Sequence, residues 1–360
     1  MRFHVVSLPH TQTTKQYLHC AYTQKVLNFC RMMKGLGHTV YLYASEDNEA
    51  LCDELIPCIT KQEQKTLIGI ERPEDNLKAE FDADKPYWKL MNKRVVVEIQ
   101  KRKKDKDFLC VIAGICQKPI ADAMPDMMTV EYGIGYSGVF APYRVFESYA
   151  WMHTVYGSLA GDASRADGRF FDAVIPNYYN VADFPFSDKK DDYFLFIGRL
   201  IDRKGYQIAV EVCKRLGKRL VVAGQGTAPD GVDYRGVVGV KERGELMSKA
   251  QAVFVPTLYI EPFGGVSVEA MLCGTPVITT DWGAFTETVK QGETGFRCRT
   301  LQEFIHAAKQ VSSLDYQKIR AYAIQRFSLE TVAKQYEEYF ARLSTLWSDG
   351  WYFLDKTEKL

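Results

Sequence analysis

The sequence lacks the features that mark several classes of protein. No run of about 18 apolar residues occurs, so no membrane-spanning helix is expected. The apolar run at the start of the chain is too short for a signal peptide. The formal net charge of +1 argues against a nucleic-acid partner. The 360 residues, 46% of them apolar, are enough for two domains with sizeable cores.

Paired cysteines are also missing. The nine cysteines are scattered along the chain, and no C-x-x-C occurs among them. An odd number of cysteines without paired spacing predicts reduced, mostly buried thiols and a cytoplasmic location. Without the spaced cysteine pairs of a zinc site, we expect no metal site.

The first half begins with a strand, a helix and a second strand. Apolar residues predict strands over 3–8 and 38–44, and apolar spacing of three and four predicts a helix over 17–33. This β-α-β order indicates a parallel sheet. The loop over 9–14 has no glycine, so the G-x-G-x-x-G of nicotinamide-binding domains is absent from its usual place. Residues 143–156 are rich in aromatic side chains and predict a helix.

Two carboxylates flank a pair of glycines in the second half. An apolar strand leads into a loop that carries Glu261 and Gly264-Gly265, and a helix over 266–272 follows with Glu269. Glycines allow close approach to backbone N–H groups, and a helix N-terminus favours an anion, above all phosphate. Two acids would repel a simple phosphate, but they accept hydrogen bonds from sugar hydroxyls. The stretch therefore predicts a site for a phosphate with a sugar on either side.

A second candidate phosphate site follows the strand over 193–197. There a glycine precedes Arg199, and Lys204 closes the turn before a helix. Arginine binds phosphate oxygens in a bidentate manner, and lysine adds a point charge. The alternative is a pair of solvated cations in a loop.

The string Glu261-Pro-Phe-Gly-Gly-Val-Ser-Val-Glu269-Ala resembles the retaining GT-B glycosyltransferases of the group 1 (family four) type. The V-I-P-N that ends at Asn177 and the G-x-T-G-F over 292–296 are similar to further motifs of that family. The resemblance is strong over residues 170–300 and only at the level of the fold over residues 1–170.

The resemblance implies an α/β fold of two Rossmann-like domains facing across a cleft. The first domain covers 1–187 and carries the acceptor side, with 345–360 packing back on it. The second domain covers 188–344 and binds the nucleotide sugar. Residues 187–192 are polar and are the expected linker.

The resemblance also implies roles for single residues. Arg199 and Lys204 would neutralise the donor diphosphate, Glu261 would bind the donor sugar, and Glu269 would bind the ribose. Val240, at a predicted strand end over 234–240, would hold the nucleobase through its backbone. The remaining donor-binding positions are Phe263, Gly264 and Gly265.

The acceptor side is less well defined. A histidine or aspartate often lines it in the resembling family, and Glu131, at the end of a strand over 127–131, occupies the nearest place. A structural turn is the alternative. The D-x-D over 82–84 follows no clear strand and is interpreted as a solvated loop. The basic run over 101–104 is interpreted as a solvated helix end, and a weak membrane-surface contact is the alternative.

The expected function is therefore retaining transfer of a sugar, such as a hexose, from a UDP- or GDP-sugar to a glycan, a lipid-linked acceptor or another hydroxyl. Two cations already oppose the diphosphate, so a metal ion should be dispensable. Two alternatives stay open. The first alternative is a GT-B-fold epimerase or phosphorylase. The second is a nucleotide-sugar-binding protein with weak activity.

Overall fold

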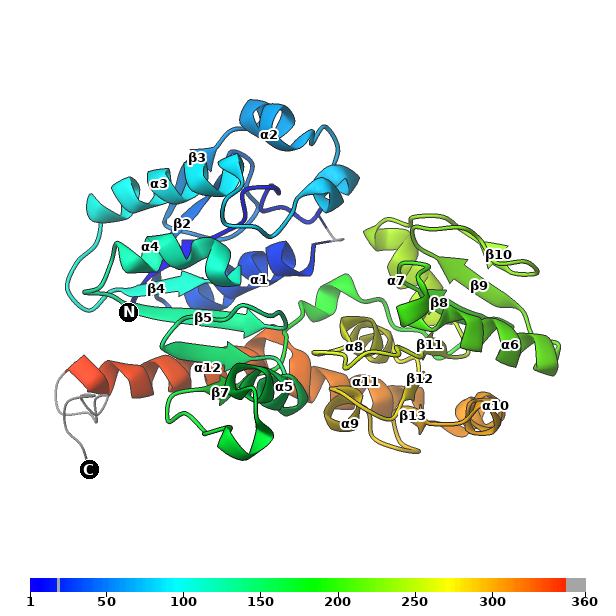
Figure 1. The fold of residues 1–360 in the computed structure, drawn as a ribbon. Helices are drawn as coiled ribbons and strands as arrows, with labels where there is room; N and C mark the ends of the chain where they lie inside the picture. Colours follow the sequence, from blue (N-terminus) through cyan, green and yellow to red (C-terminus); the bar gives the residue numbers. More distant parts are fainter. Residues whose placement is uncertain (18–19, 348–360) are drawn as a thin grey trace. The chain divides into compact units, whose positions relative to one another are not determined.

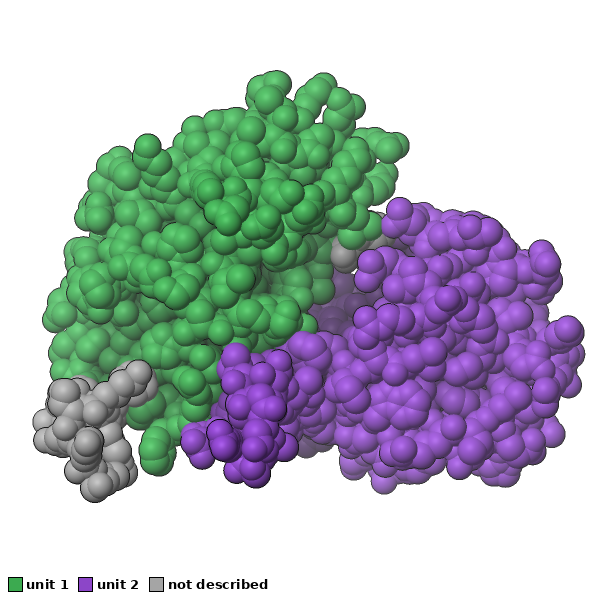
Figure 2. All heavy atoms as spheres, in the orientation of Figure 1, with its two compact units in different colours: residues 1–145, 169–175, 332–360 green, residues 146–168, 176–331 purple. Residues whose placement is uncertain are grey.

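The structure, a computed structural model, describes residues 1–17 and 20–347. The chain divides into two units, each built around one sheet, and Figure 2 colours them separately. Unit 1 holds Met1–Val145, Arg169–Ile175 and the chain from Val332, and unit 2 holds Phe146–Gly168 and Pro176–Thr331.

The sheet of unit 1 has seven strands in the order β3-β2-β1-β4-β5-β6-β7 (Figure 1). Strands β1 to β5 pair in parallel, as the β-α-β beginning predicts. The strands are β1 (Arg2–Val6), β2 (Thr39–Ser45), β3 (Glu54–Ile59), β4 (Phe108–Val111), β5 (Met128–Ile134), β6 (Tyr143–Phe146) and β7 (Ala173–Val174).

Helices accompany this sheet, and α1 begins at Ala21, four residues after the expected start. Lys15 and Gln16 lie in a turn, and the Gln24 side chain donates to the carbonyls of Thr14 and Tyr17. The helices are α1 (Ala21–Gly35), α2 (Lys61–Ile68), η1 (Pro73–Lys78), α3 (Pro86–Gln100), η2 (Gly114–Gln117), α4 (Lys118–Asp122), α12 (Leu329–Ser344) and η7 (Thr345–Trp347).

The sheet of unit 2 has six parallel strands in the order β10-β9-β8-β11-β12-β13. Counted from β8, this is the 3-2-1-4-5-6 order of Rossmann domains. The predicted strand over 234–240 is wrong in extent, because β10 ends at Tyr234 and Val240 begins a helix. The strands are β8 (Phe194–Ile197), β9 (Leu220–Ala223), β10 (Asp233–Tyr234), β11 (Val253–Val255), β12 (Val277–Thr280) and β13 (Gly295–Cys298).

Alternate side chains of this second sheet enter two different cores. Leu195 and Val253 belong to the core formed with α7, α8 and α11, whereas Phe194 and Phe254 belong to the core formed with α6 and α10. A sheet covered on both faces needs central strands that are apolar throughout, as β8, β9 and β11 are. The helices of unit 2 are α5 (Tyr149–Ala160), η3 (Ala163–Arg165), η4 (Val181–Asp183), η5 (Asp202–Lys204), α6 (Tyr206–Leu216), α7 (Val240–Lys249), α8 (Gly265–Leu272), α9 (Phe285–Thr288), α10 (Leu301–Gln310), η6 (Val311–Ser313) and α11 (Tyr316–Phe327).

This division of the chain differs from the expected boundary at 187/188. Residues 146–168 join unit 2, and most of α12 joins unit 1. The Ser148 hydroxyl donates to the Pro262 carbonyl at 2.6 Å, and the Glu287 carboxylate accepts from the backbone N–H groups of Tyr149 and Ala150. These bonds fix the start of α5 to unit 2, and no local sequence pattern predicts them.

Residues 143–156, predicted as one helix, form a strand followed by the start of a helix. Tyr143 to Phe146 form β6, a buried strand of four residues. Ser148 then caps α5, because its hydroxyl accepts from the Trp151 N–H at 3.1 Å. The cap ends the strand and begins the helix within three residues.

At the end of the described chain, the Trp347 ring lies 4.6 Å from the Phe108 ring of unit 1, centroid to centroid. The rest of the predicted packing of 345–360 falls on residues 348–360, which lie outside the described residues. Among the described helices, none is long and apolar enough to cross a membrane.

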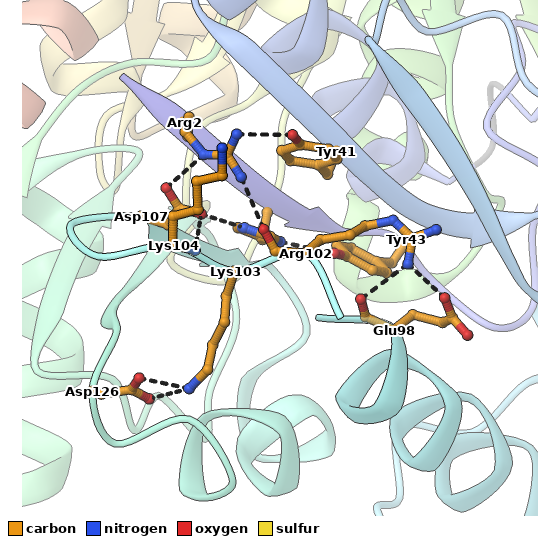
Figure 3. Close-up of polar contacts among 10 residues, drawn as sticks. Arg2, Tyr41, Tyr43, Glu98, Arg102, Lys103, Lys104, Asp107 and Asp126 are labelled. Carbon is orange, nitrogen blue, oxygen red and sulfur yellow. Dashed lines mark hydrogen bonds and ion pairs between the residues drawn. The ribbon is translucent and has the colours of Figure 1, made fainter. Parts of the chain in front are cut away.

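The basic run over 101–104 follows α3, and three of its four cations have acidic partners. Figure 3 shows those of Arg102 and Lys103. The backbone N–H of Lys104 donates to Asp107, a buried carboxylate that also accepts from Arg2 and contacts His4. This local balance of charge favours the interpretation as a solvated helix end over a membrane contact. The ion pairs are Lys101–Glu98, Arg102–Glu98, Arg102–Glu54 and Lys103–Asp126.

The glycine-free loop after β1 is packed with polar side chains that bind one another. The Thr11 hydroxyl lies within hydrogen-bond distance of the Thr23 hydroxyl, and the Thr13 hydroxyl lies within hydrogen-bond distance of the Ser7 hydroxyl. His10 is 2% exposed between the rings of Phe81 and Trp88, and its Nδ1 has no hydrogen-bond partner within the described residues. Burial lowers the pKa of His10 to about 4.

We therefore expect His10 to make the protein less stable in acid. The unfolded chain takes up a proton near the ordinary histidine pKa of about 6.5, whereas folded His10 stays neutral down to about 4. Its contribution is nil near neutral pH, and it lowers the free energy of unfolding by about 3 kcal/mol as the pH falls to 4. Urea unfolding should show that, between neutral pH and pH 4, His10→Phe loses about 3 kcal/mol less of its free energy of unfolding than the wild type. The exposed His153→Gln serves as the control, and equal pH slopes in His10→Phe and the wild type would contradict the prediction.

Candidate functional site

The predicted donor-site residues follow the two adjacent strands at which the strand order of unit 2 reverses. β8 leads to Arg199 and Lys204, and β11 leads to Glu261. β8 and β11 are parallel neighbours, so their carboxyl ends lie at the same edge of the sheet. Ligands of open α/β sheets bind at this reversal point, because the connections leave it in opposite directions. The topology thus explains why residues about 60 positions apart converge.

A close backbone contact joins the two loops. Gly205 has φ +67°, and a Cβ on it would lie 2.1 Å from the Pro256 carbonyl oxygen. The N–H of Leu258 donates to the Arg203 carbonyl at 2.9 Å. Only glycine adopts this conformation without strain and leaves room for the second loop. The turn that carries Lys204 is thereby held against the loop that carries Glu261.

Glu261 is paired with a cation. Lys204 Nζ lies 3.2 Å from Glu261 Oε2, and both side chains are partly buried. The same Nζ lies 4.8 Å from the centre of the Tyr259 ring. Burial and the neighbouring Glu261 raise the pKa of Tyr259. The loop therefore holds a cation, a carboxylate and a neutral phenol together.

Glu269 is paired with a cation as well, and sequence reasoning missed its partner. Arg243, in the first turn of α7, donates from Nε to Glu269 Oε2 at 2.7 Å, and Nη2 also donates to this oxygen. The second oxygen, Oε1, lies 3.9 Å from where a Cβ on Gly265 would be. Arg243 thus turns Glu269 so that one oxygen is occupied and the other lies beside the first residue of α8.

The N-terminus of α8 is built from the glycine pair. Gly264 has φ +77°, and a Cβ on it would lie 2.4 Å from the Phe285 ring, so no other residue fits there. Gly265 begins the helix, and no side chain caps it. The first N–H groups of a helix have no partner within the helix and favour an anion. The predicted anion site therefore has the required backbone.

The other predicted donor residues occupy different settings. Arg199 is exposed, and Val240 is the first residue of α7, with Gly239 before it. Phe263 is 3% exposed and packs against the rings of Tyr179 and Phe327. Its side chain supports the loop from within the core and is not placed to touch a ligand.

Glu131 lies in unit 1, and its surroundings differ from the expectation. It stands within β5, which continues to Ile134, and it is fully buried. Its two oxygens accept hydrogen bonds from the N–H groups of Phe140 and Ala141 and from the Tyr136 hydroxyl. Burial raises its pKa. A carboxylate with three donors anchors the loop that follows β5, and we do not carry it forward as an acceptor-side base.

No group of three or more His, Cys, Asp and Glu side chains that could hold a metal ion occurs among the residues that the structure describes. The carboxylates near the start of α8 face cations instead, as the Lys204 and Arg243 pairs show. The arrangement can bind an anion that carries neutral hydroxyl groups on both sides.

Residues 182–326 match the family model described as glycosyl transferases group 1. They form a group 1 glycosyl transferase domain. The chain is 32% identical over 147 residues to a glycogen synthase of Mycobacterium tuberculosis. That match covers 35% of this chain and 35% of the relative, so it spans about a third of the relative's length.

Solved structures extend the likeness to the whole chain at the level of the fold. AviGT4, a glycosyltransferase involved in avilamycin A biosynthesis, superposes with a TM-score of 0.69 at 19% identity, over 96% of this chain and 98% of its own. Anabaena HepE in complex with UDP and glucose gives 0.64 at 17% identity, over 95% and 99%. The chain has the GT-B fold of two Rossmann-like domains.

The Lys204–Glu261 pair leads to a prediction for this glycosyl transferase domain. A phosphate that binds Lys204 must compete with Glu261 for the same ammonium group. Glu261→Gln removes the competitor and should strengthen binding of UDP or GDP about two- to fivefold, as expected for a partly exposed ion pair. Lys204→Ala should weaken the same binding. Calorimetry at low salt measures both, and a Glu261→Gln variant that binds more weakly than wild type would exclude the competition.

Proposed function

We propose that the protein transfers a sugar from a nucleotide-diphosphate sugar to a hydroxyl acceptor and retains the configuration of the anomeric carbon. One observation carries the proposal. At the edge where β8 and β11 end, two carboxylates flank a helix N-terminus, and cations accompany both. This order of charges matches a ligand whose diphosphate lies between two hydroxyl-bearing rings.

The leaving diphosphate gains negative charge as the glycosidic bond breaks. Arg199, Lys204 and the N–H groups at Gly264-Gly265 would face that charge and stabilise the transition state. Lys204 stands on a turn that the Gly205 contact holds in advance against the loop leading to α8. Donors that need no rearrangement during the reaction contribute most to catalysis.

The two glutamates would bind the two rings. Glu261, released from Lys204 by the diphosphate, would accept hydrogen bonds from the sugar hydroxyls. Glu269, with Oε2 held by Arg243, would offer Oε1 to the ribose. Val240 would meet the nucleobase through the free backbone N–H at the start of α7. We propose UDP- or GDP-sugars as donors, and the complexes of HepE with UDP and with UDP-glucose support UDP first.

The acceptor proton would pass to an oxygen of the donor phosphate. No side chain in the group around α8 is placed as a covalent nucleophile, and Glu131 is occupied by three donors. The acceptor would be a glycan or a lipid-linked hydroxyl, and the reaction would not need a divalent metal. The nine free thiols, eight of them buried, support a cytoplasmic location.

A nucleotide-sugar-binding protein with weak activity is the second candidate, because the loop after β1 lacks the glycines found in the resembling family. Slow hydrolysis of the donor by purified protein would favour the transferase. Tight donor binding with neither hydrolysis nor transfer would favour the binding protein. An epimerase or phosphorylase would instead release an isomerised donor or a sugar phosphate.

We expect an α-linked product from an α-linked donor, formed in the presence of a chelator. An inverting enzyme needs a general base within hydrogen-bond reach of the acceptor, and the one candidate that the sequence offered is buried. NMR of the anomeric proton of the product measures the configuration. A β-linked product, or activity abolished by EDTA and restored by magnesium or manganese, would falsify the mechanism and leave the fold untouched.

A further inference from the structure

A tyrosine that no motif pointed to lies beside the N-terminus of α8. A Cβ on Gly265 would lie 2.9 Å from the Tyr179 hydroxyl oxygen and 3.9 Å from Glu269 Oε1. The phenol and the carboxylate that Arg243 positions therefore flank the first residue of the helix. Their location is the place at which the N–H groups of α8 favour an anion.

The surrounding chain holds Tyr179 rigidly. Its N–H donates to the Phe327 carbonyl at 2.9 Å, and its own carbonyl accepts from the Leu329 N–H at 3.1 Å. Its ring stacks on Phe263 and meets Phe184 edge to face. The position of the hydroxyl is thus set by the backbone and the core before any ligand binds.

Among the described residues, the backbone groups of Tyr179 make hydrogen bonds and its hydroxyl makes none. Burial raises the pKa of Tyr179 well above its ordinary value, and Glu269 and Glu261 raise it further. The phenol therefore stays protonated and can donate. A neutral O–H beside two carboxylates contributes a donor without adding charge, which suits a phosphate oxygen.

We propose that Tyr179 is a further ligand-binding residue, whose hydroxyl donates to an oxygen of the nucleoside diphosphate at the start of α8. The inference rests on the proposed function, because it needs a diphosphate at this helix. It adds a specific donor to the backbone and cations already described. It also explains why Gly265 carries no side chain, since a methyl group there would meet the hydroxyl.

Tyr179→Phe tests this by removing one oxygen and keeping the ring that packs on Phe263 and Phe184. UDP and GDP affinity should fall about tenfold, the loss expected for a hydrogen bond to a charged group. Affinity for uridine or guanosine should not change, because these lack phosphate. Tyr322→Phe, which removes a hydroxyl bound to the Thr288 carbonyl in the same unit, is the matched control and should leave both affinities unchanged.

Calorimetry of the full-length chain gives the affinities, and a melting temperature equal to that of wild type verifies the fold of Tyr179→Phe. Unchanged UDP and GDP binding in Tyr179→Phe would overturn this inference and leave the proposed function standing. An equal loss of nucleoside affinity would also overturn it, because the hydroxyl would then serve the nucleoside or the fold. If the wild type binds no nucleoside diphosphate, both proposals fail.

Discussion

The parallel pairing of β8 with β11 is the interaction on which the site of unit 2 depends. Leu195 lies opposite Val253, and Phe196 lies opposite Phe254. A slip by one residue would move these phenylalanines into the core that now takes Leu195 and Val253, so the two cores fix the register. With the register fixed, the loops after the two strands leave the same edge and bring Lys204 to Glu261.

The strength of the two ion pairs suits a binding site. The side chains of Lys204, Glu261, Arg243 and Glu269 are each about 12–24% exposed. A pair near the surface contributes up to about 1 kcal/mol, whereas breaking a fully buried pair costs about 3–5 kcal/mol. A diphosphate can therefore displace Glu261 from Lys204 at small cost. Arg243 donates to Glu269 through two N–H groups, so this pair is better suited to remain and to orient the free oxygen.

Sequence patterns predicted the parts of the site that depend on short-range chemistry. The glycine pair, Glu261 and Glu269 stand in one stretch, and the strand, loop and helix around them are where the apolar pattern places them. Arg243 and Tyr179 were missed, because each reaches the site from another segment through tertiary packing. The hydrogen bonds of Glu131 were missed for the related reason that its donors lie five to ten residues further along a loop whose path the sequence does not specify. Ser148 could have been recognised as a helix cap, which would have separated β6 from α5.

The two Rossmann-like units treat the loop after their first strand in opposite ways. In unit 2 that loop contains Gly198 and Gly205 and presents Arg199 and Lys204. In unit 1 the loop after β1 has no glycine. There the Thr13 N–H donates to the Asp47 carbonyl, and the Thr14 N–H donates to the Gln12 carbonyl.

Two backbone donors of that loop in unit 1, the N–H groups of Thr13 and Thr14, are therefore already used. Under the proposed function, fewer backbone donors of this loop remain for the donor's phosphates, and unit 2 would supply most of their hydrogen bonds. The Tyr179 hydroxyl beside α8, in addition to the cations Arg199 and Lys204, would supply such hydrogen bonds within unit 2.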